Sequence, residues 1–548
     1  MLETVRAFNA LSEEFVECSM RHDPVAATAA GIHDYDHQYP NDTPEGFGER
    51  AAWLRDLEQR LVASVPWEEL PPEHRVDYAL LRSRVASLRA DLEEIRAPAR
   101  DPVRYPQAAL RGVFLLMARP FAPLEERKEA VLARLMAVPD YLAGARANLE
   151  TVPPLFVEIA SEVNSTGPGF VEDVTRTLIR SFPGEAERIE HAGGQARMGF
   201  LQYQEFLERD LRPRAGGSIA IGERWMNFKL EREHLLGLDC ATLEAFGREH
   251  VERTRALLEK EARRLDPQRS WQEQIAAARQ RHPDALRVRD AYVAEVERAR
   301  RFVEEKRLAP LPDARLEILD TPVFERATTP HATYLRPAPF DVDQTGYFFV
   351  TPVDLTRRRD EHAQQLQGHA YPALPLIALH ETWPGHHLQL GHAVRAGSRL
   401  RRLADSPLFA EGWALYCEEL MHEQGYFLDP LTRLWQLRDQ LWRAWRVVLD
   451  VGLHTGRMSF EQAVDSLVGE AMVERVNAEA EVKRYVRTPT EPMSCLVGKT
   501  LLLEQRVDAK RRLGARFDLY EFHAALLASG TVPPALLAEE LWTRLGVA

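Results

Sequence analysis

Hydrophobic and polar positions follow a helical period along most of the chain. Up to about residue 308, apolar residues recur every three or four positions in several long segments. These segments predict helices over residues 5–20, 74–95, 124–149, 185–209, 241–265 and 287–307. The chain is therefore predicted to be mainly α-helical.

The strongest pattern covers residues 431–449. One face of this predicted helix carries leucine, valine and tryptophan: Leu434, Trp435, Leu441, Trp442, Trp445, Val448 and Leu449. Arg438 interrupts the face. Either its charged end extends past the edge of the core to solvent, or it is a cation that faces a substrate.

The pattern changes between residues 309 and 353. The segments "ARLEILD", "HATYLRP" and "TGYFFVTPV" are short, rich in β-branched and aromatic residues, and bounded by Pro and Gly. They predict a small sheet at about residues 314–353, after which helices resume at Thr356. We therefore expect an N-terminal helical region, 1–308, and a second region, 309–548, that together form one continuous body.

The last of these strands has two interpretations. If residues 347–350 form an exposed edge, an extended peptide could add to the sheet through backbone hydrogen bonds. The alternative is a buried strand whose aromatic residues pack on their neighbours.

Composition excludes several classes of protein. The 548 residues carry a net charge of −13 that is spread along the chain, which disfavours nucleic acid or an anionic membrane as a partner. No run reaches the roughly 18 apolar residues of a membrane span, and the acidic N-terminus lacks the pattern of a signal peptide. The four cysteines are far apart, as is typical of reduced thiols in the cytoplasm. We expect a soluble cytoplasmic protein, and the oligomeric state stays unknown.

The early segment "GIHDYDHQYP", residues 31–40, is rich in residues that form turns. It predicts a helix exit at which side chains bond the backbone. The alternative is a ligand role for His33, Asp34 or Asp36.

The segment "LHETWPGHHLQ", residues 379–389, begins like a zinc-binding H-E-x-x-H helix but has Pro384 where the second histidine should stand. On an ideal helix His386 would lie about 240° round from His380, and His387 would lie about 10.5 Å along the axis. Proline and the following glycine disfavour a straight helix here. A kink or bulge that absorbs two residues would bring one of the two late histidines beside His380.

A third ligand has a candidate in "EGWALYCEEL", where Glu411 follows His386 by 25 residues and stands at the predicted start of a helix. A hydrolytic zinc site needs three protein ligands and a nearby carboxylate that takes a proton from water. The alternative is an acid that complements the dipole of the helix N-terminus.

These segments, together with "GLHTGRMSFEQA" and "AEVKRY", resemble the bacterial domain-of-unknown-function 885 family. That family looks like a relative of the helical zinc peptidases (gluzincins) that include angiotensin-converting enzyme and the oligoendopeptidases. The resemblance extends from "AATAAGIHDYD" to "FDLYEFHAALLASGTVP". It implies a helical body that encloses a channel, with residues 1–308 as one wall.

The resemblance also implies a metal site. The zinc peptidases carry H-E-x-G-H, and aligning their G-H with Gly385-His386 leaves an insertion of two residues. On this alignment His380, His386 and Glu411 hold Zn2+, and Glu381 is the general base. Whether His386 or His387 is the second ligand stays open.

Later residues complete the implied site. By resemblance, Tyr485 donates a hydrogen bond to the oxyanion of the reaction, and Arg484 lies beside it. Glu481 could orient Arg484 or Tyr485; the alternative is that Glu481 and Arg484 form an ordinary helical ion pair. His454 either donates to the substrate carbonyl as a second oxyanion group or caps the C-terminus of a helix.

The leading hypothesis is a zinc-dependent metallohydrolase that cleaves short peptides. A second hypothesis keeps the site and changes the substrate to a small non-peptide amide or an acylated metabolite. A third treats the two histidines and the glutamate as an iron site for oxygen chemistry, although a base beside the metal favours hydrolysis. A fourth is a non-catalytic helical binding protein.

Overall fold

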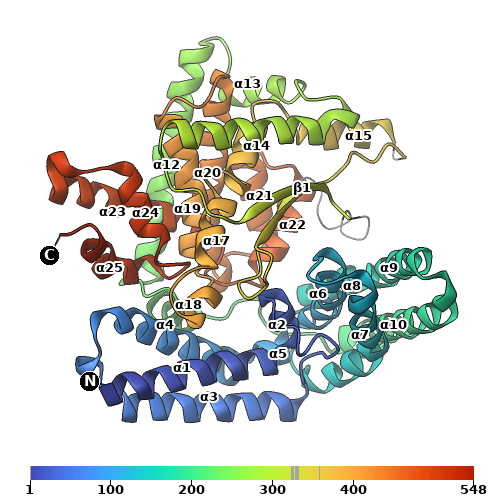
Figure 1. The fold of residues 1–548 in the computed structure, drawn as a ribbon. Coiled ribbons are helices and arrows are strands. Elements are labelled where there is room, and N and C mark those ends of the chain that lie inside the picture. The colour runs from blue at the N-terminus through green and yellow to red at the C-terminus, as the bar shows by residue number, and fades with distance from the viewer. Residues whose placement is uncertain (1, 323–325, 327–331, 357, 548) are drawn as a thin grey trace. The chain divides into compact units, whose positions relative to one another are not determined.

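The computed structural model describes residues 2–322, 326, 332–356 and 358–547 (Figure 1). His331, the first residue of the predicted second strand, lies outside them. The described chain is mainly helical with one small mixed sheet, which confirms the predicted fold class. None of its helices is both long and apolar enough to cross a membrane.

The described residues form two compact units. Unit 1 is built from residues up to Ile219 and the short segment Ala338–Asp343. Unit 2 contains the chain from Ala220 onward, apart from that segment and residues 322–327. The change of pattern at residue 309 falls inside unit 2, where the last helix before the sheet gives way to the first strand.

Unit 1 is entirely helical in its regular structure. Its helices are α1 (Leu2–His22), α2 (Pro24–Ala30), α3 (Pro44–Ser64), α4 (Pro72–Arg89), α5 (Ala97–Arg100), α6 (Arg104–Ala118), α7 (Leu124–Ala145), α8 (Pro154–Ser165), α9 (Gly167–Ser181) and α10 (Ala186–Phe206). Four of them, α1, α4, α7 and α10, match helices predicted from the sequence pattern. Most ends of these four helices lie within a few residues of the predicted ends.

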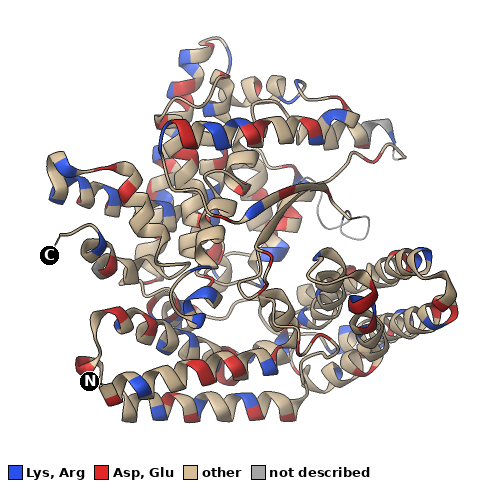
Figure 2. Ribbon diagram, in the orientation of Figure 1, with Lys and Arg blue, Asp and Glu red and all other residues tan. Residues whose placement is uncertain are grey.

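Unit 2 contains the sheet and the remaining helices. Its elements are α11 (Glu223–Phe228), α12 (Cys240–Leu265), α13 (Trp271–Ala278), α14 (Val288–Glu305), β1 (Arg315–Asp320), β2 (Ala332–Leu335), β3 (Thr345–Val350), α15 (Arg359–Gln367), α16 (Leu374–Glu381), α17 (His386–Ala393), α18 (Arg399–Leu403), α19 (Pro407–Glu423), α20 (Pro430–His454), α21 (Phe460–Ala471), α22 (Arg475–Tyr485), α23 (Ser494–Leu513), α24 (Leu519–Leu527) and α25 (Leu537–Arg544). Figure 2 shows acidic and basic residues interspersed along the helices of each unit, as the spread of charge in the sequence predicts.

The sheet has the order β1-β3-β2, with β3 parallel to β1 and antiparallel to β2. All six residues of β3 are buried. The exposed edge considered for residues 347–350 is therefore wrong, and the buried alternative holds. A strand with apolar residues on both faces is stable only where neighbouring elements cover both faces.

Helix α20 has two faces of different character. Its apolar residues pack on α12 in the core of unit 2, where Gly247 lets the two helices approach: a Cβ there would lie 3.0 Å from Val447. Arg438 is 7% exposed, pairs with Asp439 at 3.2 Å and lies over the Trp435 ring. Its charged end therefore stays inside the protein, so the predicted extension to solvent is wrong.

The segment 31–40 leaves α2 as predicted, with Gly31 at φ +83° as the helix cap. Its side chains mainly bond one another. In unit 1, His33 Nδ1 lies 2.8 Å from Asp36 and Nε2 lies 2.8 Å from Asp341. Burial lowers the pKa of His33, but the two carboxylates outweigh burial and raise it to about 9. Because carboxylates occupy both ring nitrogens, the structure does not favour a metal-ligand role for His33.

The raised pKa of His33 makes its contribution to stability depend on pH. The contribution is fully present below the unfolded pKa of 6.5 and is lost as the pH rises through about 9. We expect His33→Gln to lower the free energy of unfolding by about 2 kcal/mol at pH 6 and by much less at pH 10, measured by urea unfolding with tryptophan fluorescence. The exposed neighbour variant His37→Gln should match the wild type at both values. An equal loss at pH 6 and pH 10 in His33→Gln would contradict the charged pairing.

Candidate metal centre

The predicted break lies between α16 and α17. α16 ends at Glu381 and α17 begins at His386, so four residues separate the two helical segments. Gly385 N–H donates to Leu379 O at 3.0 Å, and Leu388 N–H donates to Thr382 O at 3.2 Å, each spanning six residues instead of four. Trp413 Nε1 on α19 donates to Pro384 O at 2.8 Å. The break therefore accommodates the two extra residues, as expected for the predicted kink or bulge.

Glycine is required at the break because the backbone folds tightly on itself. A Cβ at Gly385 would lie 1.9 Å from His380 O and 2.4 Å from Leu379 O. Both contacts are with backbone atoms that a side-chain rotation cannot move. No residue with a side chain fits this position in the same conformation.

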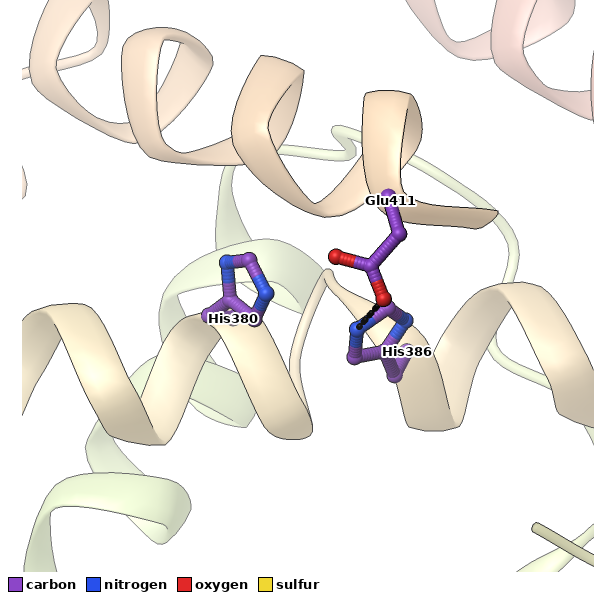
Figure 3. A group of neighbouring side chains, drawn as sticks. All are labelled: His380, His386 and Glu411. Atoms are coloured by element: carbon purple, nitrogen blue, oxygen red, sulfur yellow. Dashed lines mark ion pairs between the residues drawn. The ribbon is translucent and has the colours of Figure 1, made fainter. Parts of the chain in front are cut away.

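The break brings His380 and His386 beside Glu411 of α19 (Figure 3). Their ligand atoms all lie within 4.8 Å of one another. His386 Nε2 is 3.7 Å from Glu411 Oε1, and the two imidazole rings are 4.9 Å apart and nearly perpendicular. Three side chains from three helical segments thus converge on one point and form a group that could hold a metal ion.

The donor set fits a divalent transition metal. Zinc takes histidine nitrogens and carboxylate oxygens at about 2.0–2.2 Å in a tetrahedron, which places ligand atoms about 3.3 Å apart. The triad needs inward movement of only about 1 Å to reach such separations. Two imidazoles and a carboxylate also suit ferrous iron, so the donor set alone does not decide the metal.

Glu418 orients the first histidine, a role that sequence reasoning missed. It is 3% exposed, and its Oε1 lies 2.9 Å from His380 Nδ1. A carboxylate at Nδ1 keeps the proton there and leaves the Nε2 lone pair for a metal. Glu418 follows Glu411 by seven residues, two helical turns, so the spacing within "EGWALYCEEL" was the available signal.

Glu411 is held in its charged form. Desolvation raises its pKa, but His386, His380 and Arg446 outweigh this and lower it to about 2. Cys495 Sγ lies 3.2 Å from Oε2 and donates to it. Because α19 begins at Pro407, Glu411 stands in the second turn of the helix. The predicted helix start at Glu411 is therefore wrong, and the alternative role at the helix N-terminus does not apply.

The two late histidines have different environments. His386 is in the triad, whereas His387 Nδ1 lies 2.8 Å from the Tyr334 hydroxyl on β2. Burial lowers the pKa of His387 to about 4, so this ring is neutral at ordinary pH. The structure thus places His386 beside His380 in the triad, and the role of His386 as the second metal ligand stays a prediction.

Glu381 is the last residue of α16, adjacent to His380. Burial lowers the pKa of both triad histidines; for His380 the Glu418 carboxylate outweighs burial and the pKa is raised, whereas the pKa of His386 is lowered, and Glu381 adds a smaller raising effect to each. A carboxylate that lies within electrostatic range of both histidines is placed near any ion that they hold.

Tyr485 ends α22 and is fully buried. Its hydroxyl oxygen accepts from Trp442 Nε1 at 3.2 Å, and its ring lies about equally far from the Arg446 and Arg484 guanidiniums, at 5.4 and 5.2 Å. Burial raises the pKa of Tyr485, so the phenol keeps its proton.

Arg484 and His454 support this region. Arg484 pairs with Glu481 at 2.9 Å and Glu491 at 3.3 Å, so the helical ion pair is present. The buried His454 ends α20 and donates from Nε2 to Tyr485 backbone O at 3.0 Å. It holds the end of α22; donation to a substrate stays a prediction.

Comparison with known proteins places residues 24–541 in one family. The family model described as "Bacterial protein of unknown function (DUF885)" matches residues 24–541. Among solved structures, a protein from Shewanella oneidensis has 22% identity and a TM-score of 0.79, covering 98% of this chain and 99% of its own. A protein from Colwellia psychrerythraea has 19% identity and a TM-score of 0.84, covering 100% of both chains. Each is named a putative lipoprotein, and at these identities they show the shared fold alone. No curated protein matches the sequence.

Substitution of the glycine at the break tests the geometry of the triad. We expect Gly385→Ala to lower the free energy of unfolding by about 1–3 kcal/mol and to weaken metal binding at least tenfold, because the Cβ pushes His380 and its neighbours apart. Thermal unfolding and competition with a chelator of known affinity measure the two effects. Gly397→Ala, where a Cβ meets nothing within 4 Å, is the control. Metal binding as tight in Gly385→Ala as in Gly397→Ala would disprove the requirement.

Loss of the carboxylate behind His380 should weaken metal binding without removing a ligand. We expect Glu418→Gln to bind metal about 10- to 100-fold more weakly, measured by chelator competition. The adjacent Glu419 pairs with Lys499 and Arg433 instead. Glu419→Gln should therefore keep the wild-type metal affinity, and equal affinities in the two variants would rule out the orienting role.

Proposed function

The chain belongs to the DUF885 family of bacterial proteins of unknown function, and we propose that it is a metal-dependent hydrolase that cleaves amide bonds in short peptides. The observation that carries the proposal is the convergence of His380, His386 and Glu411, with Glu381 adjacent to the first ligand. Zinc is the proposed metal.

Each residue has a role that its position supports. A metal held by the triad would polarise the scissile carbonyl and lower the pKa of water. Glu381 would accept the proton of the attacking water and pass it to the leaving amine. Tyr485 would donate to the oxyanion; its phenol oxygen accepts from Trp442 Nε1, and its hydroxyl, which hydrogen-bonds the Glu481 carboxylate, would turn from that carboxylate to the oxyanion.

Two supporting roles complete the proposal. Arg484 keeps Glu481 beside the tyrosine, and His454 fixes the backbone at Tyr485. These contacts limit the movement of the phenol, and a fixed donor stabilises developing charge better than a mobile one. The channel implied by the resemblance, with residues 1–308 as one wall, stays a prediction.

The iron alternative uses the same three ligands. A carboxylate next to the first ligand favours hydrolysis, because oxygen chemistry at iron does not need a general base at that place. Metal analysis of protein purified without chelator separates the two: we expect about one zinc per chain. Stoichiometric iron together with oxygen consumption would replace the proposal, and a lack of any bound metal would favour a binding protein.

Two indications differ on the compartment. The free cysteines favour the cytoplasm, whereas the names of the two structural relatives favour the cell envelope. We give more weight to the envelope, since those relatives cover the whole chain. Fractionation of native cells followed by immunoblotting decides between them.

The proposed general base can be tested without disturbing the ligands. We expect Glu381→Gln to bind metal like the wild type and to lower kcat about 10³-fold, because the amide accepts no proton from water. The assay is release of amine from pooled tripeptides by metal-loaded protein. Glu419→Gln serves as the matched control for a carboxylate replaced elsewhere in unit 2. Turnover by Glu381→Gln within tenfold of the wild type would refute the role.

A further inference from the structure

Arg446 is a buried cation without an ion-pair partner among the described residues, and its guanidinium lies 5.4 Å from the Tyr485 ring. It is 7% exposed, and its Nε has no hydrogen bond. Within the described part of the chain, no carboxylate forms an ion pair with it. By contrast, Arg433 and Arg438 on the same helix each pair with an acid. A guanidinium removed from water without a partner is unfavourable, so its retention here needs an explanation.

Arg446 lies on the polar face of α20. Asp439, Arg443, Arg446 and Asp450 are spaced by four, three and four residues, which places them on one side of the helix. The groups that act electrostatically on Arg446 come from three other helices: Cys495 of α23, Tyr485 and Glu481 of α22, and Glu411 of α19. Arg446 thus lies 5.4 Å from the ring of the candidate donor Tyr485 and within electrostatic range of the candidate metal ligand Glu411.

The neighbouring acids are already engaged. Glu481 pairs with Arg484, and Asp439 pairs with Arg438. Burial raises the pKa of Asp450 to about 8, so it is mostly neutral at pH 7. Glu411 would be a metal ligand.

Arg443, one turn before Arg446, also has an unpartnered Nε. The charge of the two arginines is therefore not balanced by a dedicated acid, and an anion would complete the site.

We propose that Arg446, assisted by Arg443, binds the α-carboxylate of the amino acid that leaves the substrate. This inference rests on the proposed function and names its substrate class: acyl groups joined by an amide bond to an amino acid with a free carboxylate. The guanidinium fork matches a carboxylate in shape and charge. Only the leaving nitrogen and Cα separate that carboxylate from the scissile carbonyl carbon, so a cation near both Glu411 and Tyr485 suits it.

The reaction is hydrolysis and balances with water alone. Water adds to the acyl carbon, the C–N bond breaks, and the proton taken by Glu381 passes to the amine. The products are a carboxylate and a single free amino acid. The same chemistry is found at the carboxyl end of a peptide and in an N-acyl amino acid, and both are included in the test.

The first test compares the rates at which metal-loaded wild-type protein hydrolyses two matched sets of substrates. One set is a pool of N-acetylated tripeptides and N-acetyl amino acids with free carboxyl groups; the other is the same compounds as C-terminal amides. We expect kcat/KM to be at least tenfold higher for the free carboxyl set, with single amino acids as products. Equal rates on both sets would overturn the inference, as would equally fast cleavage of amides that end in glutamate, where the only carboxylate is in the side chain.

Substitution of Arg446 provides the second test. Arg446→Gln should abolish the preference, because KM for the free carboxyl set should rise at least tenfold more than KM for the amides. Arg433→Gln, which removes an arginine that pairs with Glu419, should keep it. Arg446→Met should also raise the melting temperature, because an unpaired buried charge is removed. A preference retained by Arg446→Gln would overturn the assignment.

A binding measurement separates this inference from the proposed function. Glu381→Gln protein is titrated with each set by calorimetry, which requires no turnover. If no compound is cleaved but the free carboxyl set binds at least tenfold more tightly, the carboxylate site holds and the proposed hydrolysis fails. If the compounds are cleaved but both sets bind equally, the hydrolysis holds and the carboxylate site fails. The wild-type comparisons decide the matter even if an Arg446 variant does not fold.

Discussion

The candidate site depends on one departure from helical geometry. A straight helix with 3.6 residues per turn cannot direct side chains six residues apart at one ion. In this protein α16 ends at Glu381 and α17 begins at His386, and backbone hydrogen bonds span the gap between them. Gly385 makes the tight return possible because any Cβ would collide with backbone oxygens. Without this break, His380 would face Glu411 without a second imidazole.

The charged and polar groups around the site form two sets, one in contact with the triad and one farther from it. Next to the triad, Glu418 fixes His380 and Cys495 bonds Glu411. Beyond them, the polar face of α20 brings arginines and acids into a region that is otherwise apolar. Such groups are retained in a protein interior only where they are paired or where function requires them. Pairing accounts for Arg438, whereas the unpaired Arg446 is best explained by a ligand.

Much of the fold followed from periodicity, and part of the site followed from spacing. The long helices and the small sheet are where the pattern predicts them, because apolar residues repeat with the period of the element that buries them. Glu411 and one of the two late histidines were expected beside His380 from the residues, the resemblance pointed to His386, and His380, His386 and Glu411 lie together. Glu418, Arg446 and Cys495 were not predicted: Glu418 carried a signal in its spacing of two helical turns from Glu411, whereas Arg446 and Cys495 reach the site through contacts between helices distant in sequence. The start of α19 was placed four residues late, since Pro407 begins the helix before its amphipathic pattern is evident.

The sequence by itself determined which elements form, and it determined that the helix at residues 380–387 must break, because proline and glycine are incompatible with a continuous α-helix there. Only the tertiary structure decided which of two adjacent histidines turns to the triad. His387 bonds Tyr334 of β2, and His386 faces Glu411 of α19. It also decided that β3 lies in the middle of its sheet and that Arg446 forms no ion pair with an acid among the described residues. These outcomes depend on contacts between residues distant in sequence, which local patterns of hydrophobicity do not encode.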